Sequence, residues 1–284
     1  MRLICKTFKL SRAAYYQAKR GAGEKIVPIE RKRKERASSV GTEDLKARIR
    51  ELVDKYPAWG VRKIWAMLRR DGLRVGQRRV WALMKAMGLT LAPERERGEE
   101  PRRGQVATPE PNRRLGTDLT TVYTRKDGLV AIVPVIDCGC RSVLALSATK
   151  RQDSRSVLAP VRQALVRAFR DVGQVPMGLE LRTDHGPQYT GTDCADLCRE
   201  WGIDHTFAPV GRPTGNAVTE RFIRTLKEEL IWLQDWDSLE ELQAALDEYR
   251  RHYNGVRPHQ ALAYQTPDEF RTSKLGDRKE AVAA

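Results

Sequence analysis

Three acidic residues, Asp118, Asp184 and Glu220, are the side chains of this sequence that best suit chemistry at a bound cation. Asp118 lies in a β-rich run, Asp184 follows the end of another, and Glu220 begins a predicted helix. An acid in a buried strand is costly unless it is paired or binds a metal ion. Each acid taken singly is typical of solvated surface, so their combination is what predicts a site.

The elements that must position these acids follow one another from residue 113 onward. Three β-rich runs separated by short breakers predict an antiparallel meander, with the sequences "LGTDLTTVYT", "LVAIVPVIDCG" and "SVLALSAT". Helices are then expected near 154–170 and 191–201, with strands near 178–183 and at "DHTFAP". Two further helices, near 216–233 and 238–253, close the region. This order predicts a mixed α/β domain, in which Asp184 lies at the carboxyl end of a strand, where α/β sheets place their sites.

The charge of the chain is concentrated before this domain. Residues 1–112 hold 28 Lys and Arg against 13 Asp and Glu, whereas residues 113–284 hold 24 of each. All of the net charge of +15 therefore lies in the first part. Such asymmetry is typical of nucleic-acid binding, although a basic face that only aids solubility would produce it too.

The basic part contains a pattern that favours a helix-turn-helix. Thr42 is expected to cap a first helix. Helices are then predicted near 60–70 and 77–87, with a stop at Gly72 between them. An ordinary helical hairpin is the alternative. The second helix would enter the major groove with the polar side chains of Gln77, Arg78, Arg79 and Lys85.

The predicted organisation has five parts. Residues 1–40 are a helical segment and basic linker, 41–90 the DNA-binding domain, and 91–112 a second linker with several prolines and no hydrophobic period. Residues 113–275 are the α/β core, followed by a tail at 276–284.

Several motifs of the core resemble a known family when they are taken in order. The acids Asp118, Asp184 and Glu220, with 35 residues between the last two, are similar to the acidic triad of the retroviral-integrase superfamily. The segments "TDHGPQYT", "NAVTERFIRTLKEEL" and "YNGVRPHQALAYQTP" resemble the integrase-like transposases of bacterial insertion sequences, of the IS-three group's second-frame type. The resemblance covers about 113–270, and the helix-turn-helix is also similar to that group's DNA-binding segment.

This resemblance implies an RNase-H-like core with a mixed five-stranded sheet and a DNA transposase that cuts and joins element ends. The triad would hold two divalent ions, Mg²⁺ or Mn²⁺. Hard oxygen ligands suit these ions, and phosphodiester cleavage uses one to activate the nucleophile and another to stabilise the leaving oxygen. Further DNA contacts are expected from Asn216, Arg224 and Lys227. The alternative for Arg224 and Lys227 is a solvated charge lattice with Glu228.

The loop before Glu220 would pass DNA through turns at Gly211, Pro213 and Gly215. Two positions depart from the family pattern, because Leu115 replaces a usual Trp and Gly215 a frequent Asp. Neither belongs to the triad.

Two rival functions remain open at this stage. One is a plain RNase-H-like nuclease, and the other is a catalytically weak protein that binds element ends and represses the intact transposase. The expected partners are element ends, target DNA, further copies of this chain and a first-frame product.

The cysteines and the apolar runs bear on other classes of site and location. Cys138 and Cys140, like Cys194 and Cys198, have spacings that could bind zinc, but their positions favour buried thiols. Five cysteines, an odd number, suggest a reducing compartment, and no apolar run approaches the roughly 18 residues of a membrane span. The cytoplasm and no membrane partner are therefore expected.

Overall fold

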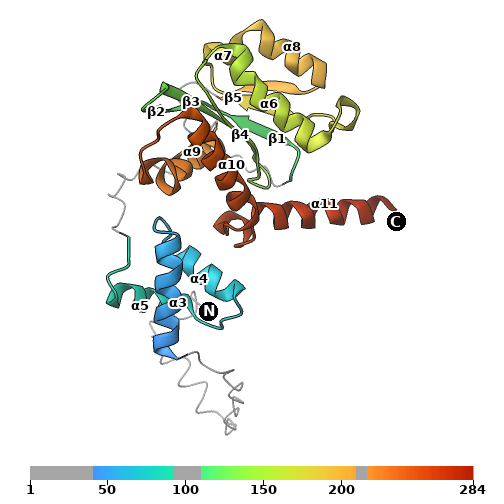
Figure 1. Ribbon diagram of the computed structural model, residues 1–284. Helices are drawn as coiled ribbons and strands as arrows, with labels where there is room; N and C mark the ends of the chain where they lie inside the picture. The colour runs from blue at the N-terminus through green and yellow to red at the C-terminus, as the bar shows by residue number, and fades with distance from the viewer. Residues whose placement is uncertain (1–40, 92–109, 209–215, 284) are drawn as a thin grey trace, which may run out of the picture. The chain divides into compact units, whose positions relative to one another are not determined.

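The computed structural model of the chain describes residues 41–91, 110–208 and 216–283 (Figure 1). The predicted segment at 1–40, most of the second linker, and the turns at Gly211, Pro213 and Gly215 lie outside these residues.

The first described range forms three helices around an apolar core of their own. The helices are α3 (Thr42–Lys55), α4 (Val61–Arg70) and α5 (Gln77–Ala86). Gly72 has a φ of +84° between α4 and α5, which suits glycine at this turn. Both predicted helices of the helix-turn-helix and the stop between them are therefore present. The capping prediction was wrong, since Gly41 is the N-cap of α3 and Thr42 is already helical.

The α/β part is built on one mixed sheet. Its strands are β1 (Arg114–Thr117), β2 (Thr120–Thr124), β3 (Gly128–Asp137), β4 (Val143–Thr149), β5 (Glu180–Thr183) and β6 (Asp204–Phe207). The strands β1, β2 and β4 pair antiparallel with β3, while β5 is parallel to both β1 and β6.

The sheet has six strands instead of the predicted five because the first β-rich run is interrupted. β1 and β2 pair with successive parts of β3, and Asp118 and Leu119 lie in the break between them. Asp118 thus directly follows a strand, which corrects its predicted place inside one. The mixed α/β architecture is as predicted.

Helices cover both faces of the sheet (Figure 1). On one face lie α6 (Ser154–Phe169), α7 (Pro187–Thr190) and α8 (Thr192–Trp201), and on the other α9 (Ala217–Glu229) and α10 (Leu239–Gly255). Neighbouring residues of β3 serve the two cores, since Val133 packs on the α6 side and Ile132 on the α9 side. Because successive side chains of a strand point to opposite faces of the sheet, β3 is buried on both faces.

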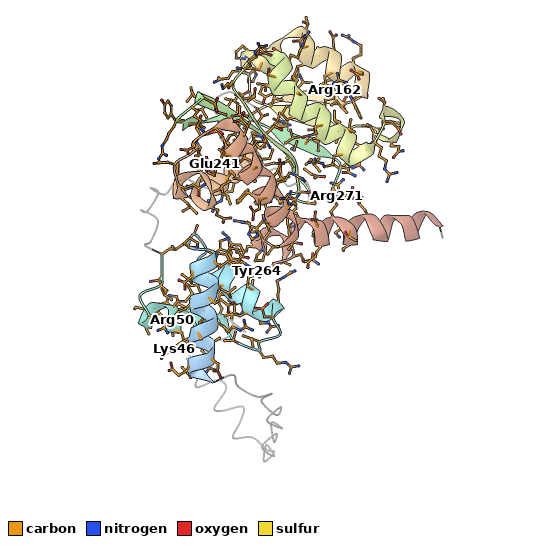
Figure 2. The ribbon with its side chains drawn as sticks, viewed as in Figure 1. Lys46, Arg50, Arg162, Glu241, Tyr264 and Arg271 are labelled. Carbon is orange, nitrogen blue, oxygen red and sulfur yellow. The ribbon has the colours of Figure 1, made fainter. Side chains whose placement is uncertain are left out.

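The last helix, α11 (Pro267–Ala283), continues through the predicted domain end at 275, so most of the predicted tail is helical. Near its start, Arg271 (labelled in Figure 2) forms an ion pair with the buried carboxylate of Asp137 at 3.4 Å. Asp137 also accepts hydrogen bonds from the backbone N–H groups of Asn112 and Gly139, both at 2.8 Å. Asp137 is therefore a structural acid.

No helix among the described residues is long and apolar enough to cross a membrane.

Candidate active site

Two of the three predicted acids follow adjacent parallel strands. In the register of β1 and β5, Gly116 lies opposite Arg182. The strands end at Thr117 and Thr183, and Asp118 and Asp184 come next in the chain. The carboxyl ends of neighbouring parallel strands share one edge of the sheet, so the two acids emerge at the same place.

Backbone hydrogen bonds fix the two aspartates locally. Asp118 Oδ1 accepts a hydrogen bond from the N–H of Leu119 at 2.7 Å, and Asp184 Oδ1 accepts one from the N–H of Gly186 at 3.0 Å. Both acids thus belong to tight turns at the strand ends.

The third acid is brought to this edge by helix α9. At the N-cap of α9, Asn216 donates a hydrogen bond from Nδ2 to the carbonyl oxygen of Thr117 at 3.0 Å. Thr219 of the first turn is fully buried and lies against Gly116 of β1. Glu220 follows Thr219 and is exposed. The first turn of α9 therefore presents Glu220 beside the strand end that carries Asp118.

The electrostatics of Asp118 show that the charges of the other two acids reach it. The pKa of Asp118 is raised to about 6, chiefly by burial and also by the negative charges of Asp184 and Glu220. Burial also raises the pKa of Glu220. Negative charge that is poorly compensated and offered by oxygen ligands fits a divalent cation such as Mg²⁺.

Lys227 lies near enough to act on this site. Its positive charge lowers the pKa of Asp118, against the larger effect of burial. The residue is seven positions after Glu220, which is about two helical turns or roughly 10 Å along α9. Arg224 instead forms an ion pair with Glu228 through Nε at 2.7 Å. This pair is the one expected in the charge lattice that the sequence offered as the alternative to a DNA contact.

Asn216 differs from its predicted role. Its side chain was expected to contact DNA, but it is 6% exposed and bonded to β1. The polar atoms Asn216 Oδ1 and Thr219 Oγ1 are buried, and neither has a hydrogen-bond partner in the described part of the chain. Sequence reasoning missed the contact between Gly116 and Thr219, whose only signal is a small residue two positions before Asp118.

Around the acids, Tyr189 and His185 complete the local structure. The buried Tyr189 places its hydroxyl 3.3 Å from Thr117 Oγ1. His185, next to Asp184, is exposed and stacks on Phe207 with 4.8 Å between ring centroids.

The predicted base-reading residues all lie on the surface of α5. Gln77, Arg78, Arg79 and Lys85 are exposed, whereas Val80 and Met84 face the helical core. Arg79 also donates a hydrogen bond to Thr42 Oγ1 at 3.2 Å. Trp81, which the sequence analysis did not select, is 49% exposed and has Lys85 Nζ 5.2 Å from its ring centroid. The exposed surface of α5 thus combines cations with one aromatic ring.

Both parts of the chain are similar to known protein families. Residues 108–213 and 201–267 match two families described as integrase core domain, and residues 42–97 match an HTH-like domain. Transposase InsD for insertion element IS2A/D/F/H/I/K of Escherichia coli is 28% identical over 239 residues, which are 80% of this chain and 78% of that protein. InsD for element IS2-9 of Escherichia coli strain K12 is also 28% identical, over 80% and 76% of the two chains.

Solved structures resemble the chain more weakly. The HTLV-2 integrase catalytic core in complex with magnesium, in its trimeric form, has a TM-score of 0.43 and 17% identity, covering 57% of this chain and 97% of that one. A simian T-cell lymphotropic virus intasome in complex with the PP2A regulatory subunit B56 gamma has a TM-score of 0.47 and 16% identity, covering 78% and 74%.

Proposed function

We propose that this chain, which matches integrase core domains over residues 108–213 and 201–267 and is 28% identical to an insertion-element transposase, is an integrase-like transposase of bacterial insertion sequences. It would cut and join element ends by metal-dependent phosphoryl transfer at Asp118, Asp184 and Glu220. The observation that carries this proposal is the convergence of these residues. Two acids follow adjacent parallel strands, and the third begins a helix that is bonded to one of them. The pKa of Asp118 is raised chiefly by burial and further by the charges of Asp184 and Glu220, and a bound cation would offset both effects.

The cations would be Mg²⁺ or Mn²⁺, two in each site, because carboxylate oxygens are hard ligands. When bound, such ions activate the attacking hydroxyl and stabilise the leaving oxygen. The chain itself supplies the geometry. The turns after β1 and β5 orient the aspartates. The contact of α9 with β1 fixes the position of Glu220.

DNA contacts are assigned to two surfaces. The exposed side chains of α5 (Gln77, Arg78, Arg79, Trp81 and Lys85) would bind the element end, with base readout in the major groove. Lys227, whose charge acts on Asp118, would hold a phosphate near the reacting bond. Arg224 could contribute a second phosphate contact once released from Glu228.

The proposed division of the chain follows these surfaces. Residues 41–90 form the DNA-binding domain and 113–275 the catalytic core, with α11 extending beyond it. The working form would be a homo-oligomer on two element ends, with a first-frame product fused or associated, and it would act in the cytoplasm.

A strand-transfer assay with labelled element ends and separate target DNA tests the proposal against its two rivals. A transposase would produce joined products with Mg²⁺ or Mn²⁺, and a nuclease would produce only cleaved DNA. A repressor would bind the ends and shift their mobility but would neither cleave nor join them. Glu220→Gln should abolish cleavage and joining while end binding persists, because a ligand is lost without added bulk. Glu228→Gln, two turns along the same helix, is the matched control and should keep activity. Joining at the wild-type rate by Glu220→Gln would refute the assignment.

A further inference from the structure

A second group of potential metal ligands lies away from the three acids, between α8 and β6. Cys194 and Cys198 are one helical turn apart on α8, and His205 is in β6. Their ligand atoms all lie within 4.8 Å of one another, and among the described residues no other three His, Cys, Asp or Glu side chains are grouped so closely. The sequence predicted buried thiols here but did not place His205 beside them.

The distances suit a tetrahedral cation with sulfur and nitrogen ligands. Cys194 Sγ lies 3.8 Å from Nδ1 of His205 and 3.9 Å from Nε2. A Zn–S bond of about 2.3 Å and a Zn–N bond of about 2.0–2.1 Å, at tetrahedral angles, separate S and N by roughly 3.6 Å. The separation of Cys194 Sγ and Nδ1 of His205 is thus close to that of two ligands of one zinc ion.

The hydrogen bonds of Thr183 determine which nitrogen of His205 is available. Thr183 Oγ1 donates its one hydrogen to the carbonyl oxygen of Asp184 at 2.8 Å, so it accepts from Nε2–H of His205 at 3.0 Å. Nδ1 is then the unprotonated nitrogen. A metal-bound histidine commonly donates its other ring N–H to an oxygen in this way.

The surroundings favour a soft cation over Mg²⁺. The Cys194 side chain is fully buried and Cys198 is 5% exposed, while His205 is half-buried. Thiolate and imidazole ligands suit Zn²⁺, whereas Mg²⁺ requires oxygen ligands. Two thiolates with one neutral imidazole would balance the charge of a divalent ion, so its burial leaves no net charge.

We propose that Cys194, Cys198 and His205 bind one Zn²⁺, through the two sulfurs and Nδ1, with a water molecule as fourth ligand. Binding releases the two thiol protons to solvent and involves no electron transfer. The ion would tie α8 to β6 and, through His205 and Thr183, brace the turn that carries Asp184. The inference rests on this cluster alone and stands whether or not the acids catalyse transposition.

The chain holds an internal control in its other thiol pair. Cys138 and Cys140 are also buried, but Cys140 Sγ accepts a hydrogen bond from Arg271 Nη1 at 3.9 Å. A guanidinium is a cation and offers no ligand. Cys140→Ser should therefore leave metal binding unchanged.

Cobalt titration of the reduced, chelator-treated full chain tests the proposal. One equivalent of Co²⁺ should produce thiolate-to-cobalt charge-transfer bands and intense tetrahedral d–d bands, and Zn²⁺ should remove both. Cys194→Ser and His205→Gln should lose these bands, whereas Cys140→Ser and Asp118→Asn should keep them. Thr183→Val, which removes the oxygen partner of Nε2, should weaken cobalt affinity about 10- to 100-fold.

The wild-type titration decides the matter even if a variant fails to fold. The absence of thiolate bands in reduced wild-type protein would overturn the proposal and leave a packed pair of thiols beside a histidine. Bands that persist in both Cys194→Ser and His205→Gln would overturn it as well. Cobalt binding without thiolate bands, and lost in Asp118→Asn, would place the cobalt at the acids instead.

Discussion

Gly116 of β1 and Thr219 of α9 lie so close together that a Cβ added to Gly116 would stand less than 3.0 Å from Thr219 Oγ1. Asn216 Oδ1 would be 3.2 Å from the same Cβ. Helix α9 can therefore approach β1 this closely only because position 116 has no side chain. The approach matters because Glu220 follows Thr219 directly, so it sets the distance between Glu220 and Asp118.

Gly116→Ala should push the first turn of α9 outward and separate Glu220 from Asp118. We expect a loss of about 1–3 kcal/mol in unfolding free energy, little or no Mg²⁺-induced rise in Tm, and strongly reduced strand transfer. Thr219→Ala removes the hydroxyl that the new methyl group meets, so the double variant should regain part of the Mg²⁺ response. Gly191→Ala, whose added Cβ would have 3.8 Å to its nearest neighbours, is the control and should behave as wild type. A double variant no better than Gly116→Ala would contradict the steric explanation.

Asp118→Asn should stabilise the protein in the absence of metal. The pKa of Asp118 is about 6 in the folded chain against an ordinary 3.8, so the folded state disfavours its charged form. This penalty is absent below pH 4, grows as pH rises towards 6 and then stays near its full value of about 3 kcal/mol. Melting curves recorded in chelator should show the Tm of the variant rising relative to that of wild type as pH increases from 4 to 6. A constant difference from pH 4 to pH 8 would contradict the assigned cause.

Glu229 and Arg257 form a buried ion pair whose loss should cost much stability. Their side chains are 6% and 8% exposed, and Arg257 donates two hydrogen bonds to the carboxylate, both at 2.8 Å. Burial raises the pKa of Glu229, but positive charge and hydrogen bonds, those of Arg257 first among them, more than offset this and lower it to about 2. Glu229→Gln should cost about 3–5 kcal/mol at pH 7, because Arg257 stays buried without its partner charge.

The same pair predicts a pH dependence. A lowered pKa means that the stabilisation by Glu229 is complete above its ordinary value of 4.5 and is lost as pH falls towards 2. Urea denaturation should therefore show wild type and Glu229→Gln converging between these values. Glu228→Gln, which removes the half-exposed partner of Arg224, should cost less than about 1 kcal/mol at every pH. An equal cost for both variants at pH 7 would show that burial of the pair is unimportant.

Local patterns predicted the helices and strands of the chain and the three acids. Hydrophobic periodicity located α4 and α5, because each buries one stripe of its surface. The acids were selected because Asp118 lies in a β-rich run, Asp184 follows another and Glu220 begins a predicted helix, and because their order resembles the triad of a known family. Leu115, which departs from the family pattern, packs in the core, since its side chain is fully buried.

Contacts between distant segments were not predictable in this way. Gly116 and Thr219 are far apart in sequence, and neither carries a periodic signal for the other. The resemblance assigned Asn216 to DNA, and it gave no sign that the amide donates a hydrogen bond to a carbonyl of β1. His205 likewise meets Cys194 only because β6 lies beside α8. Such pairings depend on the packing of the sheet, which no single stretch of sequence encodes.

Arg78→Ala should reduce binding to element ends and relax the choice of sequence. Arg78 is exposed near the start of α5, where a recognition helix contacts base edges. Loss of a base contact costs about 1–3 kcal/mol on the specific site. Fluorescence anisotropy on end and scrambled duplexes at several salt concentrations measures this. Arg199→Ala, on α8 and paired with Asp196, is the control with the same change of charge. Equal losses on both duplexes, with a salt slope lowered by about 1, would make Arg78 a phosphate contact instead.

Lys227→Ala should weaken the joining of element ends more than it weakens binding of the full chain to DNA. The lysine acts on the reaction site, since its charge lowers the pKa of Asp118, while the excess positive charge that dominates nonspecific affinity lies before residue 113. Removing this cation should also raise the pKa of Asp118 further, so the pH at which joining reaches half its maximum should shift upward. Lys227→Arg keeps the charge and should keep the pH profile, which separates the electrostatic role from a packing role. The measurements are strand-transfer rates from pH 5.5 to 8.5 and end-binding affinities for the three proteins. Equal losses of binding and joining in Lys227→Ala, with an unchanged pH profile, would show that Lys227 belongs only to the general positive field of the protein.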